Sequence, residues 1–93
     1  MSYDVLIEKE ATNGLKKAPT SIQNKFYKWV DLVENIGLPT VRKIPGFHDE
    51  PLKGKRKGQR SIRLNRAWRA IYRVTSTGKI TFVLVEEITK HEY

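Results

Sequence analysis

The stretch PTSIQNKFYKWVDLVENIGLP, which begins at Pro19, constrains the fold of this 93-residue chain more than any other segment. Thr20 followed by Gln23 forms a capping-box pattern, and Gly37, with a proline two residues later, predicts a helix end. A helix is therefore predicted over about Ser21–Ile36. Its apolar residues share one helix face, where we expect the aromatic members to anchor a core rather than stack on bases: Ile22, Phe26, Trp29, Val30, Val33 and Ile36.

Three strand-like segments in the second half of the chain offer the apolar surface that such a helix needs. Arg60–Leu64, Trp68–Thr75 and Lys79–Ile88 are rich in β-branched and aromatic residues. The links near Asn65–Arg66 and at Ser76–Gly78 are short, so we expect the three strands to form an antiparallel meander.

The first half of the chain adds a predicted strand at Tyr3–Glu8 and a short helix within Lys9–Ala18, which Gly14 weakens. Leu38–Gly58 is a long connection that contains several prolines and glycines. The predicted order is β-α-α-β-β-β in a single domain of residues 1–93. The fold class is α+β, with a mainly antiparallel sheet packed on one face by the N-terminal helices and open on the other.

The positive charge of the chain is concentrated in one block. The formal net charge is +8, and the stretch between Pro51 and Val85 contains no Asp or Glu. Such a block predicts one basic face, whose usual partners are phosphates or an acidic protein segment. Its basic residues are Lys53, Lys55, Arg56, Lys57, Arg60, Arg63, Arg66, Arg69, Arg73 and Lys79.

Strand alternation assigns the arginines of the block to the open face of the predicted sheet. In the middle strand, Trp68, Ala70, Tyr72 and Val74 share one face, and the residues between them share the other. The same rule separates Ile62 and Leu64 from their neighbours in the preceding strand. We therefore expect a basic groove on the open face, formed by Arg63, Arg69, Arg73 and the lysines of the 51–58 loop.

Several function classes lack their sequence signals. The chain has no cysteine, no apolar run long enough to span a membrane, and no signal-peptide pattern at its N-terminus, so we expect a cytoplasmic protein. P-loop, G-x-G-x-x-G and H-E-x-x-H patterns are missing, and no cofactor is expected. We predict no metal site, because His48 and His91 are far apart in the sequence and the positive field opposes cation binding.

Phosphate chemistry matches these side chains best. RNA carries its own nucleophile, the 2′-hydroxyl group, so a metal-free enzyme needs a base, an acid and fixed cations. Arg69 and Arg73 are candidates to hold the phosphate as planar forks. Candidates for proton transfer are His91, Tyr93, Lys53 and Lys55.

Structural roles are the alternative for the same residues. His91 is then a solvated residue near the terminus, Tyr93 covers the core, and His48 has a structural role in its loop. The two arginines of the middle strand, Arg69 and Arg73, instead form ion pairs with the neighbouring strand's Glu86 and Glu87.

The segment EPLKGKRKGQRSIRLNRAWRAIYRV, followed by a glycine turn, a hydrophobic strand and KHEY, resembles the RelE/ParE superfamily of bacterial toxins. Within that superfamily the chain looks most like HigB-like and RelE-like members. The motif resemblance covers Pro51–Tyr93, and the N-terminal half matches in layout only. The resemblance implies a type II toxin, an mRNA interferase that cuts mRNA in the ribosomal A site by metal-free attack of the 2′-oxygen on the adjacent phosphate.

Residue roles also follow from this resemblance. Arg69 matches the strand arginine that binds the scissile phosphate, and Lys55 lies in the loop where members place basic catalytic or RNA-contacting residues. His91 and Tyr93 match C-terminal catalytic positions, while Glu50 or Glu92 is the base if a carboxylate is used. The expected partners are a cognate antitoxin in a hetero-oligomer, the bacterial ribosome and mRNA. Expected RNA contacts are Lys53, Arg56, Lys57, Arg60, Arg63, Arg66 and Arg73.

Three functions compete at this point. The first is the ribosome-dependent mRNA endonuclease, which the C-terminal His91 and Tyr93 favour. The second is a ParE-like poison of DNA gyrase, which has the same fold without nuclease chemistry. The third is a nucleic-acid-binding module without toxicity, whose affinity depends steeply on salt.

Overall fold

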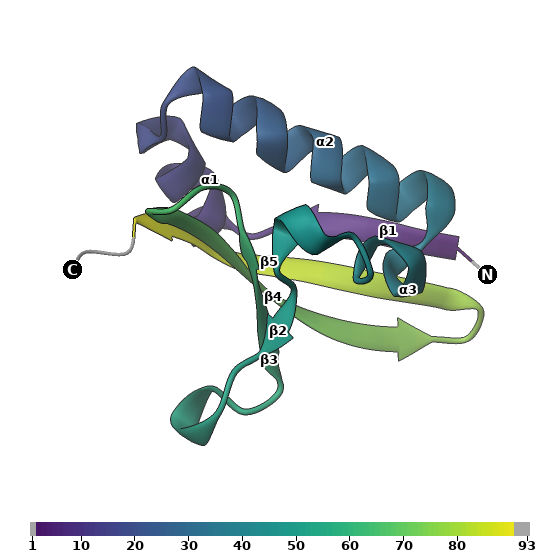
Figure 1. The fold of residues 1–93 in the computed structure, drawn as a ribbon. Coiled ribbons are helices and arrows are strands. Elements are labelled where there is room, and N and C mark those ends of the chain that lie inside the picture. Colours follow the sequence, from purple (N-terminus) through teal and green to yellow (C-terminus); the bar gives the residue numbers. More distant parts are fainter. Residues whose placement is uncertain (1, 91–93) are drawn as a thin grey trace.

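A mixed five-stranded sheet forms the centre of the molecule, of which the computed structural model describes residues 2–90. Its strands lie in the order β1-β5-β4-β3-β2 (Figure 1). β1 pairs with β5 in parallel, and all other neighbours are antiparallel. The strands are β1 (Ser2–Ile7), β2 (Glu50–Pro51), β3 (Gln59–Arg63), β4 (Trp68–Thr77) and β5 (Ile80–Lys90).

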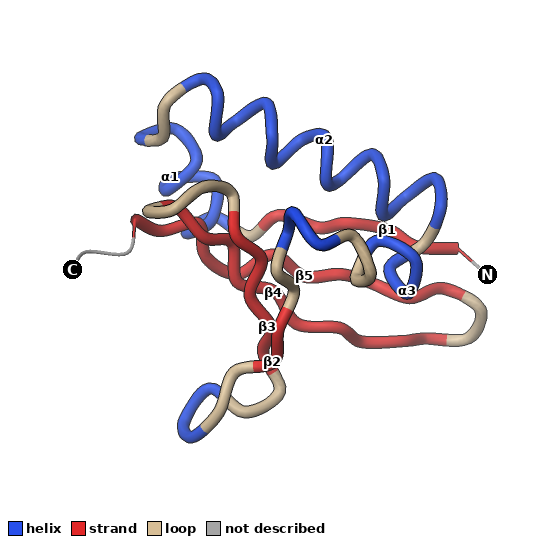
Figure 2. Tube along the Cα trace, viewed as in Figure 1, coloured by secondary structure: helices blue, strands red, loops and turns tan. Residues whose placement is uncertain are grey.

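The helices lie on one side of this sheet. α1 (Lys9–Lys17) packs against β5, α2 (Thr20–Ile36) packs against β1, and the short α3 (Leu38–Val41) follows α2 directly. Figure 2 shows α1 and α2 above the strands, and below them a short 3-10 turn, Gly54–Arg56, in the loop between β2 and β3. In the described part of the chain, no helix is long and apolar enough to cross a membrane. The predicted α+β class, with a mainly antiparallel sheet and helices on one face, is confirmed.

The core lies between α2 and the sheet. Phe26 and Trp29 are completely buried, as the spacing of apolar residues predicts. The Trp29 ring lies 6.1 Å from that of Phe26 and 5.3 Å from that of Tyr72 on β4, measured between ring centroids. Burial of each such side chain stabilises the fold by about 1.5–3 kcal/mol.

The capping box predicted at the start of α2 is wrong. The helix begins at Thr20, and the residue before it, Pro19, makes no side-chain capping bond. Gln23 instead donates from Nε2 to the carbonyl oxygens of Leu15 and Ala18, at 3.1 Å each. Since only two residues separate α1 from α2, the carbonyl groups at and just after the end of α1 are within reach of Gln23.

The long connection after α2 has more structure than its sequence predicts. It contains α3, two short 3-10 turns at Pro45–Phe47 and Gly54–Arg56, and the edge strand β2. β2 pairs with β3 through Glu50 opposite Ser61, which extends the sheet beyond the predicted meander. The loop between β2 and β3 therefore leaves from an ordered sheet edge.

Candidate nucleic-acid interface

The face of the sheet away from the helices carries the arginines that strand alternation assigns to it. Arg63 lies opposite Arg69, and Gln59 lies opposite Arg73, on the paired strands β3 and β4. The alternating residues Ala70 and Tyr72 are buried in the core, which confirms the predicted division of β4 between two faces.

Arg63 and Arg69 form a pair of positive charges that is only weakly compensated by the described residues. They are direct cross-strand neighbours, and like charges in that position repel. The nearest carboxylate that the described residues offer to Arg69 is Glu50, whose Oε1 lies 4.0 Å from the Arg69 Nη1. The Nε atom of Arg63 is buried and has no hydrogen-bond partner among the described residues. An anion bound at Arg69 would be attracted by the charges of both guanidinium groups.

A pocket of about 390 Å³ opens beside Arg69. Its floor includes Ser61, whose buried hydroxyl oxygen also has no partner within the described part of the chain. The pocket is lined by Glu50, Leu52, Arg56, Ser61, Arg69, Ile71 and Thr89. It thus combines hydrogen-bond donors, among them Arg56 and Arg69, with a carboxylate and an apolar surface.

The C-terminal end of β5 borders this pocket. Thr89 lies opposite Arg69, and Lys90 lies opposite Trp68. His91 and Tyr93, the two predicted C-terminal catalytic residues, come next in the sequence but lie outside the described residues. Their roles therefore stay predictions.

The predicted lysine loop protrudes from the edge of the sheet between β2 and β3 (Figure 1). A bond from the Leu52 amide to the Gln59 carbonyl oxygen, at 2.9 Å, closes its base. Lys53, Lys55 and Lys57 are all exposed on it. The structure therefore presents three exposed lysines on a loop whose Leu52 and Arg56 line the Arg69 pocket, which suits contact with a polyanion.

A β-bulge in β5 brings two acidic residues onto the same open face. Ile71 pairs with Glu87 and Tyr72 pairs with Val85, so Glu86 is the extra residue. In β5 the buried residue Val85 is accordingly followed by the next buried residue, Ile88, three positions later. Both glutamates between them face away from the helices. That step of three residues in a period-2 pattern is the sequence signal that could have predicted the bulge.

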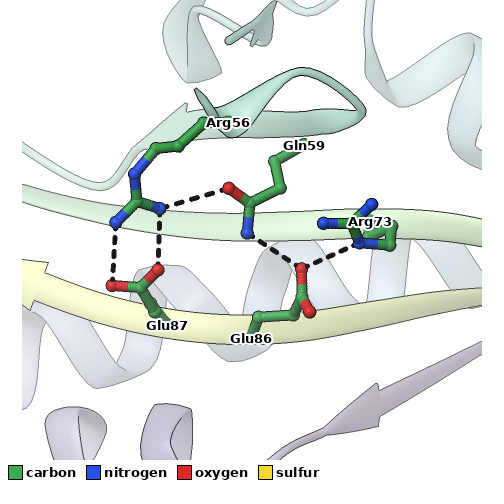
Figure 3. A network of polar contacts seen from close by, with 5 residues as sticks. All are labelled: Arg56, Gln59, Arg73, Glu86 and Glu87. Atoms are coloured by element: carbon green, nitrogen blue, oxygen red, sulfur yellow. Dashed lines mark hydrogen bonds and ion pairs between the residues drawn. The ribbon is translucent and has the colours of Figure 1, made fainter. Parts of the chain in front are cut away.

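These glutamates bind two of the predicted RNA-contacting arginines, as Figure 3 shows. Arg56 donates to both oxygens of Glu87, at 2.7 and 3.4 Å. Arg73 donates from Nε to Glu86 at 3.3 Å, and Gln59 links the two pairs by donating to Glu86 at 3.0 Å and accepting from Arg56 at 3.2 Å. The hydrogen bond and the charge of Glu87 raise the pKa of Arg56. The structural alternative for Arg73 is therefore confirmed, whereas Arg69 pairs with neither glutamate.

Arg60 does not share the open face, so the prediction of a single basic face is wrong at this position. Arg60 lies opposite the buried Tyr72 and donates from Nε to Asp49 at 2.6 Å. Tyr72 donates its hydroxyl hydrogen to the other oxygen of Asp49. The Asp49 side chain is only 1% exposed, so this pair of bonds fixes the segment that leads into β2. Sequence spacing gives no signal for a contact over such separations.

Arg66 lies in the turn between β3 and β4, away from the lysine loop. The Asn65 side-chain oxygen accepts from the Ala67 and Trp68 amides, at 2.7 Å each, and holds this turn. Arg66 is exposed there, near the same end of the sheet as Arg63 and Arg69.

Replacement of Tyr72 by phenylalanine tests the bond to Asp49. We expect a loss of about 1 kcal/mol of unfolding free energy at pH 7, because one buried hydrogen bond is removed. Burial and the Asp49 carboxylate also raise the pKa of Tyr72 in the folded state. The native protein therefore keeps its tyrosine proton above pH 10, where the unfolded chain loses it, and stability falls as the pH rises. Urea unfolding from pH 7 to 11 should show a steeper alkaline loss for the unmodified protein than for Tyr72→Phe; parallel curves would contradict the assignment.

Comparison with solved structures identifies the fold. A chain of the E. coli DinJ–YafQ toxin–antitoxin complex matches with a TM-score of 0.74 at 24% identity, over 98% of this chain and 94% of that one. The archaeal RelE–RelB complex from Pyrococcus horikoshii matches with a TM-score of 0.68 at 26% identity, over 97% and 96% of the two chains. The YoeB/ParE toxin from Agrobacterium tumefaciens matches with a TM-score of 0.68 at 20% identity, over 96% and 99%.

Sequence comparisons add no further relative. No protein-family model matches the chain, and no curated protein sequence matches it. The likeness therefore lies in the fold, which matches these toxin structures over nearly their whole length.

Proposed function

Since this chain has the fold of RelE/ParE-like toxins, as its sequence predicts, we propose that it is the toxin of a type II toxin–antitoxin pair and cuts mRNA in the ribosomal A site. The observation that supports this most directly is the Arg63–Arg69 pair beside a donor-lined pocket and three exposed lysines. Such an arrangement binds a phosphate and the backbone around it.

In the proposed reaction the 2′-oxygen of one nucleotide attacks the adjacent phosphorus. The new bond from the 2′-oxygen to phosphorus forms as the bond to the 5′-oxygen breaks, which leaves a 2′,3′-cyclic phosphate and a free 5′-hydroxyl group. A base removes the 2′-hydroxyl proton, and an acid protonates the leaving oxygen. Arg69, as a planar fork, would hold the non-bridging oxygens, on which negative charge builds up in the transition state.

One candidate group for proton transfer lines the pocket, and the others follow Lys90 at the C-terminal end of the sequence. The Glu50 side chain is 60% exposed and lies next to Arg69, so it is a candidate base. We propose His91 and Tyr93 as further proton-transfer groups, and Lys55 as a donor to the phosphate from the loop. Lys53, Lys57, Arg63 and Arg66 would contact the flanking RNA.

The partners follow from the same proposal. The ribosome would present the mRNA, and an antitoxin would bind the toxin in the cytoplasm and block its activity. An acidic antitoxin segment that covers Arg69 would suit the charge of the open face.

The proposal is tested with purified protein and bacterial ribosomes stalled on a defined mRNA. Primer extension should show new RNA ends within the A-site codon, while the same mRNA without ribosomes stays intact. If no cleavage occurs on ribosomes, the nuclease proposal fails. A gyrase supercoiling assay on the same preparation would then test the alternative of a DNA gyrase poison.

A further inference from the structure

The arginines on the open face of the sheet fall into two groups. Arg69 has a long ion pair with Glu50, at 4.0 Å, and the Arg63 Nε has no hydrogen-bond partner among the described residues. Arg56 and Arg73 instead form ion pairs with Glu87 and Glu86, at 2.7 and 3.3 Å. The open face is therefore more strongly positive around Arg63 and Arg69 than around Arg56 and Arg73, although Arg56 also lines the pocket beside Arg69.

The neutralised end still has the guanidinium groups that RNA phosphates use. The Arg56 and Arg73 side chains are 47% and 45% exposed, so a phosphate can reach both. A carboxylate and a phosphate occupy the same positions on a guanidinium fork, however. A phosphate that binds the Nη1–Nη2 edge of Arg56 must displace Glu87, and one that binds elsewhere on the guanidinium is still repelled by this carboxylate from close range.

The backbone of β5 gives each of these two arginines a carboxylate partner. Strict alternation would place only one of two consecutive residues on the open face. The bulge at Glu86 turns both glutamates toward it, so that each arginine has its own carboxylate and Gln59 bridges the two pairs (Figure 3). The acidic pair is thus built into the sheet geometry, and it is not a flexible surface cluster.

We propose that Glu86 and Glu87 are specificity-determining residues that weaken the binding of free single-stranded RNA to the open face and confine phosphate binding to the Arg63–Arg69 end. The inference rests on the proposed function, because it assumes that RNA is the ligand of this face. It gives a physical reason why a chain of net charge +8 would leave free RNA largely unbound and act on RNA presented by the ribosome.

The test compares Glu86→Gln and Glu87→Gln with the control Asp31→Asn. Each variant removes one negative charge with little change in shape, and Asp31 is exposed on α2, on the opposite side of the sheet. Binding of a labelled oligouridine of about 12 nucleotides is measured by fluorescence anisotropy between about 50 and 200 mM salt. The two glutamate variants should bind about 3–10-fold more tightly than the unmodified protein, and Asp31→Asn less than about 2-fold more tightly.

The salt dependence separates this role from a structural one. Each arginine released to bind a phosphate should steepen the slope of log K against log salt by about 0.7 for single-stranded RNA. A merely structural glutamate would change thermal stability without this steepening. Affinities and slopes equal to those of Asp31→Asn, or no measurable RNA binding by either glutamate variant, would overturn the inference.

Failure of the proposed function gives a different result. Ribosome-dependent cleavage is measured on the unmodified protein in parallel. If it is absent while the glutamate variants still gain RNA affinity, the nuclease proposal fails and the role of the glutamates in RNA binding stands. If cleavage occurs but the glutamate variants behave like Asp31→Asn, the inference alone fails.

Discussion

Replacement of Arg69 by alanine should lower ribosome-dependent cleavage by about 10²–10³-fold, the usual cost of losing one donor to a developing negative charge. Arg69 is the arginine at the pocket that has no close ion pair with Glu86 or Glu87, so its fork is available to the phosphate. The rate is measured by primer extension on programmed ribosomes. Because Arg63 lies directly opposite, the loss of one of two repelling charges should leave the unfolding free energy unchanged or slightly higher.

Two further variants make the Arg69 prediction specific. Arg69→Lys keeps the charge but loses the planar fork, so its rate should lie between those of the unmodified protein and Arg69→Ala. Arg42→Ala removes the same kind of side chain from an exposed position after α3, and it should keep the full rate. A rate for Arg69→Ala within about threefold of the unmodified protein would exclude Arg69 from the phosphate site. A rate for Arg69→Lys as low as that for Arg69→Ala would mean that geometry, rather than charge, is what the site needs.

Period-2 alternation correctly places Arg63, Arg69 and Arg73, because each of these residues lies in a regular part of its strand. It does not predict the Arg56–Glu87 pair, because the bulge shifts the phase of β5 and Arg56 lies in a loop, where strand alternation does not apply. Local rules thus predict the arginines of the site and the pairing of Arg73 with Glu86, but not the pairing of Glu87 with Arg56.

Contacts between distant segments account for the rest of what the sequence left unpredicted. The parallel pairing of β1 with β5 joins the two ends of the chain and has no local signal. The burial of Asp49 depends on Tyr72 and Arg60, which lie in two other strands. The amphipathic pattern of α2 and the short links of the meander are local, and these elements were predicted almost to the residue.

Gly14 shows how a local rule can assign a residue the wrong effect. Helix propensity alone marks it as a weak point in α1, because glycine costs about 1 kcal/mol relative to alanine inside a helix. In the structure, α1 lies so close to β5 at this position that a Cβ atom on residue 14 would overlap the Ile88 carbonyl oxygen. The residue after Ile88 is Thr89, which lines the pocket beside Arg69. The glycine therefore permits the close packing of α1 against β5, which fixes the position of this end of β5.

Gly14→Ala should lower the unfolding free energy by about 2–3 kcal/mol, since the backbone overlap outweighs the gain in helix propensity. Gly46→Ala is the matched control: a Cβ atom there meets nothing within 4 Å, so stability should be unchanged or slightly higher. Urea unfolding measures both variants, and cleavage by Gly14→Ala should also fall, because α1 and the end of β5 must separate. If Gly14→Ala is as stable as Gly46→Ala, α1 does not lie this close to β5, and the end of β5 beside Arg69 is held by its strand pairing alone.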